Sequence, residues 1–468
     1  MLLIVLAIQP LANAQAEEAA VYAITANYRV TNNGPGTALN ARMIIFLFDN
    51  ISGWSEQTVL SENIQGVSTF LSNIESTADN RWVRVSVGDL GAGESRTVTV
   101  TQMVKVKSVK ILVDPNDVGT SYPPETLDFV LSVDGLYESN NSAIQALSQQ
   151  LTNNVTNPYY KARRIFDYLL ENFNYEFQQT EHSALWALQN GRGDCTEFSN
   201  LFIALARAAG IPAKSISGFG YLPLYTLQAG TDIKTLGHAW SIFYLPNYGW
   251  VPADAVWPQY IGSFGKTDYA HIAGASTGGE GIVRDGTIYW PGPGSIKEPY
   301  ITYSGVQPNV DFSWDGGTII PEVFVDVSLQ APSQIQNDMM TLTMTVKNMG
   351  RNLARNLVAE LDVDPTYFEV ITSRHKDNLT SGEQWVTTFD VRLREGAYDN
   401  KHTFTSKVTY ESAYGEINGT FLAKGETPVS IPAKPVAFEQ AYNIMLFALI
   451  GVVIVLVVVA AAVVLMRR

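Results

Sequence analysis

The chain of 468 residues is too long for one ordinary hydrophobic core and predicts roughly two to four domains. Hydrophobic residues make up 46% of it and charged residues only 16%, which excludes a solvated, disordered chain. A net charge of −14 without a basic cluster argues against nucleic acid as a partner, and a single cysteine excludes an intramolecular disulfide.

The N-terminal segment has the pattern of a weak or truncated signal peptide. An apolar stretch over residues 2–11 is followed by Ala12-Asn13-Ala14, the small-residue pattern of a signal-peptidase site. No Lys or Arg precedes the apolar stretch, which weakens the signal. We predict a signal peptide over residues 1–14.

The next segment alternates in the manner of β-strands. Apolar residues alternate with more polar ones at Tyr22, Ile24, Ala26, Tyr28 and Val30, and again from Val98 to Val106. Runs rich in Asn, Gly and Asp over residues 32–36 and 88–93 supply turns. This pattern predicts an antiparallel β-sandwich over residues 18–113.

Helices and then strands follow, which predicts an α+β domain over residues 114–306. Asn157 and Pro158 are suited to the N-cap and first position of a helix. Its buried face would carry Ala162, Ile165, Phe166, Leu169, Leu170 and Phe173. A shorter helix is predicted over residues 183–189, and strands are predicted over residues 214–220, 239–245 and 250–255.

The only cysteine, Cys195, is predicted in the first turn of a buried helix. An apolar stripe at spacings of three and four follows it, at Phe198, Leu201, Phe202, Leu205 and Ala209. Asp194 fits an N-cap and Glu197 fits its capping-box partner, while Gly210 and Pro212 end the helix. The free N–H groups and the dipole at a helix N-terminus favour a thiolate. Taken alone, Cys195 could equally be a small buried core residue.

A predicted hairpin downstream brings a histidine and an aspartate to one face of a sheet. If its turn is centred on Asn247, Val256 lies opposite His238 and Asp254 is a diagonal neighbour of that histidine. A shift of one residue would turn Asp254 to the other face. In the predicted register, Cys195 is a candidate nucleophile, His238 its acid–base partner and Asp254 the carboxylate that orients the imidazole.

No cofactor or metal is expected. The other four histidines show no metal-ligand spacing to one another: His182, His271, His375 and His402.

The third segment, over residues 321–426, again alternates and predicts an immunoglobulin-like β-sandwich. It repeats a pattern of the first. Val30-x-Asn32-x-Gly34 with Ala38-x-Asn40 recurs at the same spacing as Val346-x-Asn348-x-Gly350 with Ala354-x-Asn356. The repeat favours two sandwiches of shared architecture that flank the α+β domain, although convergent turn chemistry would give the same match.

The C-terminal residues predict a stalk and a membrane span. Residues 427–443 contain three prolines and fit a stalk. Residues 444–466 carry no charge and are long enough to cross a bilayer. The positive-inside rule places Arg467 and Arg468 in the cytoplasm and the rest outside. Five Asn-x-Ser/Thr sequons agree weakly with this topology, at Asn50, Asn140, Asn154, Asn378 and Asn418.

Three sequence blocks, in order, resemble the transglutaminase-like superfamily over about residues 157–257. They are Gly193-Asp194-Cys195, Gly237-His238-Ala239-Trp240 and Trp250-Val251-Pro252-Ala253-Asp254. The resemblance implies a papain-like fold with a triad of Cys195, His238 and Asp254. Two positions depart from the family pattern, with Lys214 where arginine is common and Ala255 where proline often follows the aspartate.

The expected protein is multidomain, with a papain-like α+β domain between two β-sandwiches and a C-terminal transmembrane helix. We expect an enzyme anchored in the cell membrane with its N-terminal portion outside the cytoplasm. It would attack amide bonds of a protein or peptide substrate and form a thioester. Water as acceptor makes a peptidase or amidase, which the resemblance slightly favours, and a primary amine makes a transglutaminase. The alternative is a surface adhesion or interaction protein with an inactive scaffold. Substrate and oligomeric state are left open.

Overall fold

The computed structural model describes residues 16–434, except 77–79, 222–226, 257–262, 278–281, 285–286, 290–299, 304, 331–334, 371–372 and 416. The predicted signal peptide, the predicted transmembrane helix over residues 444–466 and the two terminal arginines lie outside the described residues. Within the described ranges, no helix has both the length and the apolar character that a bilayer span requires.

The N-terminal β-sandwich is built from two sheets. One has the strand order β12-β20-β1-β7-β3, and the other has the order β19-β2-β6-β4, with β5 also paired to β6. The strands are β1 (Ala19–Asn32), β2 (Ala38–Leu47), β3 (Glu56–Gln65), β4 (Thr69–Phe70), β5 (Glu75–Ser76), β6 (Arg81–Leu90), β7 (Ser95–Lys107), β12 (Thr231–Asp232), β19 (Tyr300–Tyr303) and β20 (Val310–Val323). The alternating apolar residues of β1, β2, β6 and β7 face one another and form the core.

This sandwich is not continuous in sequence, which corrects the predicted domain limits. β20 pairs antiparallel with β1 from Val21↔Val323 to Asn32↔Val310, and β19 pairs with β2. Residues 300–303, which the sequence pattern placed in the α+β domain, therefore belong to the sandwich, as does the segment up to Val323. Antiparallel partners can come from any distance along a chain, so alternation within one segment cannot reveal them.

The C-terminal sandwich packs the sheet β21-β22-β26-β24 on the sheet β25-β23-β27-β28. Its strands are β21 (Val325–Gln330), β22 (Met339–Asn348), β23 (Ala354–Asp362), β24 (Phe368–Val370), β25 (Arg374–Leu379), β26 (Gln384–Leu393), β27 (Asn400–Tyr414) and β28 (Ile417–Ile431). β28 runs into the segment that was predicted as the stalk, because Ile431 still pairs with Asn400. Pro428 is accommodated because β28 is an edge strand.

The sequence repeat marks equivalent places in the two sandwiches. Asn32 and Asn348 are both buried, and each side-chain oxygen accepts a hydrogen bond from the N–H two residues on, at 3.1 and 3.0 Å. Each side-chain amide donates to backbone carbonyl groups across the turn. Asn40 and Asn356 share the left-handed conformation, with φ of 51° and 50°. A buried asparagine therefore stabilises the equivalent turn in each of the two sandwiches.

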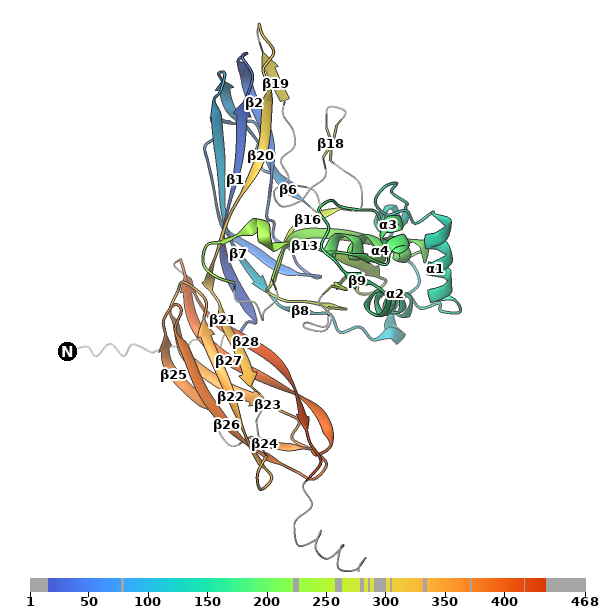
Figure 1. Ribbon diagram of the computed structural model, residues 1–468, viewed down its shortest axis with the longest axis vertical. Helices are drawn as coiled ribbons and strands as arrows, with labels where there is room; N and C mark the ends of the chain where they lie inside the picture. The colour runs from blue at the N-terminus through green and yellow to red at the C-terminus, as the bar shows by residue number, and fades with distance from the viewer. Residues whose placement is uncertain are drawn as a thin grey trace, which may run out of the picture.

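The central α+β body is inserted between β7 and β19, and β12 within this insertion pairs with β20 of the sandwich. Figure 1 shows its helices on the side of the sheet β14-β13-β11-β16 that faces away from the N-terminal sandwich. Its main elements are α1 (Ser142–Thr152), α2 (Pro158–Asn172), β9 (Asn174–Tyr175), α3 (Ala184–Asn190), β10 (Arg192–Gly193), α4 (Cys195–Ala208), β11 (Ala213–Gly220), β13 (Gly237–Leu245), β14 (Gly249–Ala253) and β16 (His271–Thr277). Smaller elements are β8 (Val109–Lys110), η1 (Pro115–Asp117), η2 (Pro124–Val130), η3 (Ile233–Leu236), β15 (Lys266–Thr267), β17 (Ile282–Arg284) and β18 (Thr287–Tyr289).

Helix α4 is the centre of this body. Its apolar residues are buried against α1, α2, α3 and the strand β13. The opposite face of the sheet packs on the N-terminal sandwich, where Phe219 and Ile272 share a core with Tyr22 and Val104. Helix α4 is therefore held by the other helices, and the sheet is held by the N-terminal sandwich. Because both are closely packed, side chains on the helix and the sheet lie at a constant distance from each other.

Candidate active site

Cys195 is the first residue of α4, and a capping box fixes the start of that helix. The side chain of Asp194 accepts a hydrogen bond from the N–H of Thr196 at 3.0 Å. The carboxyl group of Glu197 accepts hydrogen bonds from the N–H of Asp194 and of His182, both at 2.8 Å. Burial raises the pKa of Glu197, although these two hydrogen bonds oppose the shift. The predicted cap is confirmed, and it places a half-buried Cys195 at the helix N-terminus.

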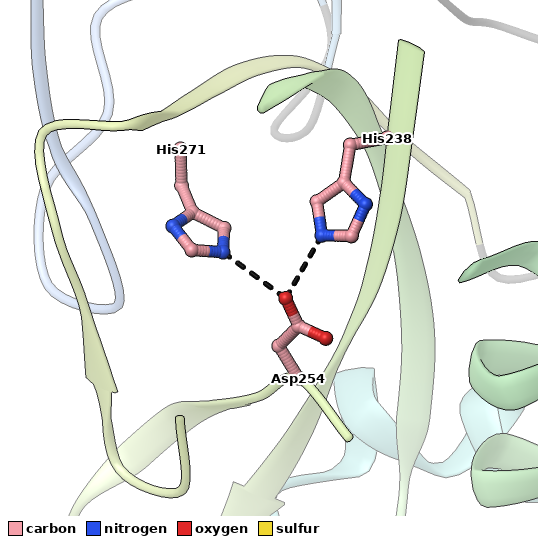
Figure 2. A group of neighbouring side chains, drawn as sticks. All are labelled: His238, Asp254 and His271. Atoms are coloured by element: carbon pink, nitrogen blue, oxygen red, sulfur yellow. Dashed lines mark hydrogen bonds and ion pairs between the residues drawn. The ribbon is translucent and has the colours of Figure 1, made fainter. Parts of the chain in front are cut away.

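The predicted register of the hairpin is also confirmed. β13 and β14 pair through Ser241↔Ala253 and Tyr244↔Trp250, which centres the turn on Asn247, a residue with φ of 77°. The register carries Asp254 to the same face as His238. Figure 2 shows the imidazole and the carboxylate pointing toward each other, with Nε2 of His238 2.8 Å from Oδ2 of Asp254. Both side chains are buried.

Asp254 is held by its backbone and by both carboxylate oxygens. Its N–H donates to the carbonyl of Ser263 at 2.9 Å, and the hydroxyl of Ser263 donates to its carbonyl. Oδ1 accepts a hydrogen bond from the N–H of Val256 at 2.8 Å, which leaves Oδ2 to the imidazole groups. The carboxylate is therefore oriented before any substrate arrives.

The electrostatics favour a protonated His238. Burial by itself lowers the pKa of His238, but the charge and hydrogen bond of Asp254 and a hydrogen bond with Cys195 raise it to about 10. Burial likewise raises the pKa of Asp254, and the neighbouring imidazole groups outweigh this and hold it well below its usual range. Because Asp254 occupies Nε2 of His238, Nδ1 is the ring atom left for the hydrogen bond with Cys195.

One residue of this cluster, His271, was missed by the sequence analysis. It is the first residue of β16 and is buried, with Nε2 3.1 Å from Oδ2 of Asp254 (Figure 2). Its other nitrogen, Nδ1, lies 2.8 Å from Oδ1 of Asp268. No sequence motif joins His271 to the hairpin. In the sheet order β14-β13-β11-β16, β11 lies between β13 and β16. Only the pairing of β16 with β11 brings His271 to the site.

The same three side chains could in principle hold a metal ion. Ligand atoms of His238, Asp254 and His271 all lie within 4.8 Å of one another, and two imidazoles with one carboxylate make a donor set that zinc accepts. The distances of 2.8 and 3.1 Å from the two Nε2 atoms to one Oδ2 are those of hydrogen bonds. We therefore assign these contacts as hydrogen bonds and not as metal coordination.

Two exposed aromatic side chains lie on β9 and the residues that follow it, next to the strand that precedes Cys195. β9 lies parallel to β10, where the N–H of Glu176 donates to the carbonyl of Gly193 at 2.8 Å. Tyr175 and Phe177 are 59% and 75% exposed on this segment. Burial and the charges of Cys195, Asp194 and Glu197 raise the pKa of Tyr175.

Two curated relatives match part of the chain. An uncharacterized protein of Haemophilus influenzae is 26% identical over 161 residues, which are 28% of this chain and 42% of that protein. The uncharacterized protein YebA of Bacillus subtilis is 28% identical over 131 residues, or 25% of this chain and 18% of YebA. The chain thus spans less than half the length of these relatives.

Similar solved structures include a candidate cysteine protease from Cytophaga hutchinsonii, at 17% identity and a TM-score of 0.40, covering 65% of this chain and 98% of that one. The periplasmic domain of TgpA from Pseudomonas aeruginosa has 15% identity and a TM-score of 0.26, with 52% and 91% covered. Red sea bream transglutaminase has 11% identity and a TM-score of 0.27, with 86% and 78% covered.

The family assignment rests on a stretch that contains the site. Residues 145–255 match the transglutaminase-like superfamily, from helix α1 to the residue after Asp254. Cys195, His238 and Asp254 fall within this stretch, and His271 falls beyond it. The protein therefore carries a domain of the transglutaminase-like superfamily at residues 145–255, between β-rich flanking regions.

Proposed function

We propose that the protein is a thiol acyl-transfer enzyme that cleaves amide bonds through a thioester on Cys195. One observation carries this proposal. Nε2 of His238 lies 2.8 Å from the carboxylate of Asp254, which leaves Nδ1 for the hydrogen bond with Cys195, the first residue of α4. A nucleophile, a base in contact with it and a group that orients the base together make up the arrangement needed for covalent acyl transfer.

The first half-reaction forms the thioester. The thiolate of Cys195 attacks the amide carbonyl carbon, and the S–C bond forms as the carbonyl oxygen becomes an oxyanion. The N–H of Cys195, in the first turn of α4, has no acceptor within the helix and can donate to that oxyanion. The C–N bond then breaks, and Nδ1 of the His238 imidazolium gives its proton to the leaving amine.

The second half-reaction releases the acyl group. A water molecule attacks the thioester and gives a proton to neutral His238. The S–C bond breaks, and the thiolate is restored beside an imidazolium. We propose water as the main acceptor because Cys195 is only half-buried, which supports solvent access to the thioester. A primary amine that reaches the same position would instead produce a transamidation.

We further propose that the enzyme acts outside the cytoplasm on protein or peptide substrates while anchored in the cell membrane. This placement is supported by the uncharged residues 444–466, by the two arginines after them and by the signal-like pattern of residues 1–14. Protease added to intact cells should then remove the domains before residue 444. Complete protection of these domains would refute the placement.

The rate of alkylation of Cys195 by iodoacetamide, measured against pH, tests the catalytic proposal. An ion-paired thiolate should react fast at neutral pH and keep its reactivity well below pH 8. Slow reaction with a thiol pKa near 8.5 would contradict the proposal and favour an inert interaction module. Cleavage of a peptide library and incorporation of a fluorescent primary amine then identify the acceptor, with Cys195→Ala as the blank.

A further inference from the structure

The hydrogen bonds of His271 define its charge. Both of its ring nitrogens lie at hydrogen-bond distance from carboxylate oxygens, Nε2 at 3.1 Å from Asp254 and Nδ1 at 2.8 Å from Asp268. An ionised carboxylate only accepts hydrogen bonds, and a neutral imidazole donates from only one nitrogen. Either His271 carries a proton on both nitrogens, or one of the two carboxyl groups is protonated.

The other partners of the carboxylates favour the first alternative. Asp254 accepts two further hydrogen bonds, from the N–H of Val256 at 2.8 Å and from His238 at 2.8 Å. Asp268 accepts one from the N–H of Ala270 at 2.9 Å. Each of these bonds stabilises an ionised carboxylate. Burial lowers the pKa of His271, but Asp268 and Asp254 outweigh this and raise it.

We propose that His271 is a permanent imidazolium that shares Asp254 with His238 and thereby positions the carboxylate and limits the basicity of His238. This inference rests on the proposed function, because it assigns His271 a role in the same reaction. His271 does not touch the reacting atoms and acts only through Asp254. A chain of hydrogen bonds thus runs from Cys195 through His238, Asp254 and His271 to Asp268.

The consequence for catalysis concerns the transfer of a proton from His238 to the leaving amine. Asp254 alone would make His238 strongly basic, and a strongly basic imidazole is a poor acid for the leaving amine. A second cation on the same carboxylate oxygen reduces this effect. The ring centroids of His238 and His271 are 5.6 Å apart. Repulsion between the two charges should therefore lower the pKa of His238 by about one to two units at an effective dielectric constant near 20 to 40.

The charged groups that face His271 are Asp268 before β16, Asp254 after β14 and the imidazole of His238 from β13. Three buried tyrosines lie near Asp268, namely Tyr269 before β16, Tyr221 after β11 and Tyr22 from β1. Burial and neighbouring groups raise the pKa of the three tyrosines, so they stay neutral near Asp268. The indole ring of Trp240 packs edge-on at 5.2 Å and carries no charge.

The protonation state can be observed directly. The chain has five histidines, so the full-length protein in detergent micelles, labelled with nitrogen-15 at histidine only, gives a simple ring spectrum. A Cys195→Ala background removes the thiolate, and a His271→Gln variant assigns the His271 signals. The proposal expects two nitrogen-bound protons on His271 at pH 7. One bound proton, with a second nitrogen that carries none, would overturn it.

The influence on His238 is tested by its ring titration in the same background. Loss of the imidazolium in His271→Gln should raise the pKa of His238 by about one unit, since a repelling charge is gone. If His271 only held Asp254 in place, the carboxylate in His271→Gln would lose its fixed orientation toward His238, and the pKa of His238 would fall. An unchanged or lowered pKa therefore refutes the proposal.

A second variant guards against misfolding. In Asp268→Asn with His271→Gln, two amides can hydrogen-bond each other and Asp254 without a buried charge, and the pKa of His238 should again rise. His375→Gln is the matched control, because His375 also bonds an aspartate, Asp377, but on an exposed strand. These titrations need no turnover. A failure of the proposed function would appear instead as slow alkylation of wild-type Cys195.

Discussion

Gly193 lies directly against the side chain of Glu197: a Cβ added at residue 193 would stand 2.3 Å from the Cβ of Glu197. Glu197 closes the capping box below Cys195, so an alanine at residue 193 must displace it. We expect Gly193→Ala to destabilise the fold by about 1–3 kcal/mol and to lower kcat/KM by about 100-fold, since the nucleophile shifts. Gly237→Ala, whose Cβ meets no atom within 4 Å, should retain most activity in the same assay.

Asp254→Asn tests the orienting carboxylate. An amide has nearly the same size but cannot accept from both imidazoles with the charge of a carboxylate, so the pKa of His238 should fall and the ion pair with Cys195 should weaken. By analogy with serine triads, we expect kcat to drop by about 10³–10⁴. Steady-state kinetics against pH measure this. Asp377→Asn removes an exposed His–Asp pair and should leave kcat unchanged, and equal losses in both variants would contradict the assignment.

The ion pair also predicts how stability depends on pH. The pKa of His238 rises on folding from 6.5 to about 10, so its contribution is complete below about pH 6.5 and disappears as the pH rises through 10. The pKa of Asp254 is lowered on folding, so its contribution is present above about pH 4 and is lost at lower pH. Calorimetric Tm values should be highest between these limits. The profile should flatten in the double variant His238→Gln and Asp254→Asn.

Local signals made much of the site predictable from the sequence. The cap at Asp194 and Glu197 and the two-strand register around Asn247 each involve residues close in sequence, and spacing alone specifies them. His271 and β20 could not be predicted in this way. Both reach their partners through strand pairing between segments far apart in the sequence. No local sequence pattern indicates which strand each one pairs with.

The pairing of β1 with β20 predicts where the chain can be cut. A chain that ends at Val306 lacks β20, so it exposes the edge of β1 and one side of the sandwich core. We expect this chain to aggregate or to unfold at a Tm at least 10 °C lower than a chain that ends at Phe324. Expression yield and calorimetry compare the two. Equal stability would show that β20 is dispensable.

The repeated asparagine makes a second stability prediction. The side chain of Asn348 is buried and donates to the carbonyl groups of Asn352 and Leu379, both at 2.8 Å. Asn348→Ala leaves these acceptors unpaired and should cost about 2–4 kcal/mol in denaturant unfolding. Asn356→Gly serves as the control, because glycine tolerates the φ of 50° at this position and the change should stay within about 0.5 kcal/mol. Equal costs would contradict the buried role of Asn348.

The position of β1 between β7 and β20 has a consequence for the order of folding. During synthesis β1 and β7 emerge early, but the strand that completes their sheet emerges only after the whole thiol-bearing body. Closing this long loop costs conformational entropy before the contacts between β1 and β20 can form, which makes the step slow. The inserted body should therefore reach its native state first, and the N-terminal sandwich should then assemble around its two connections.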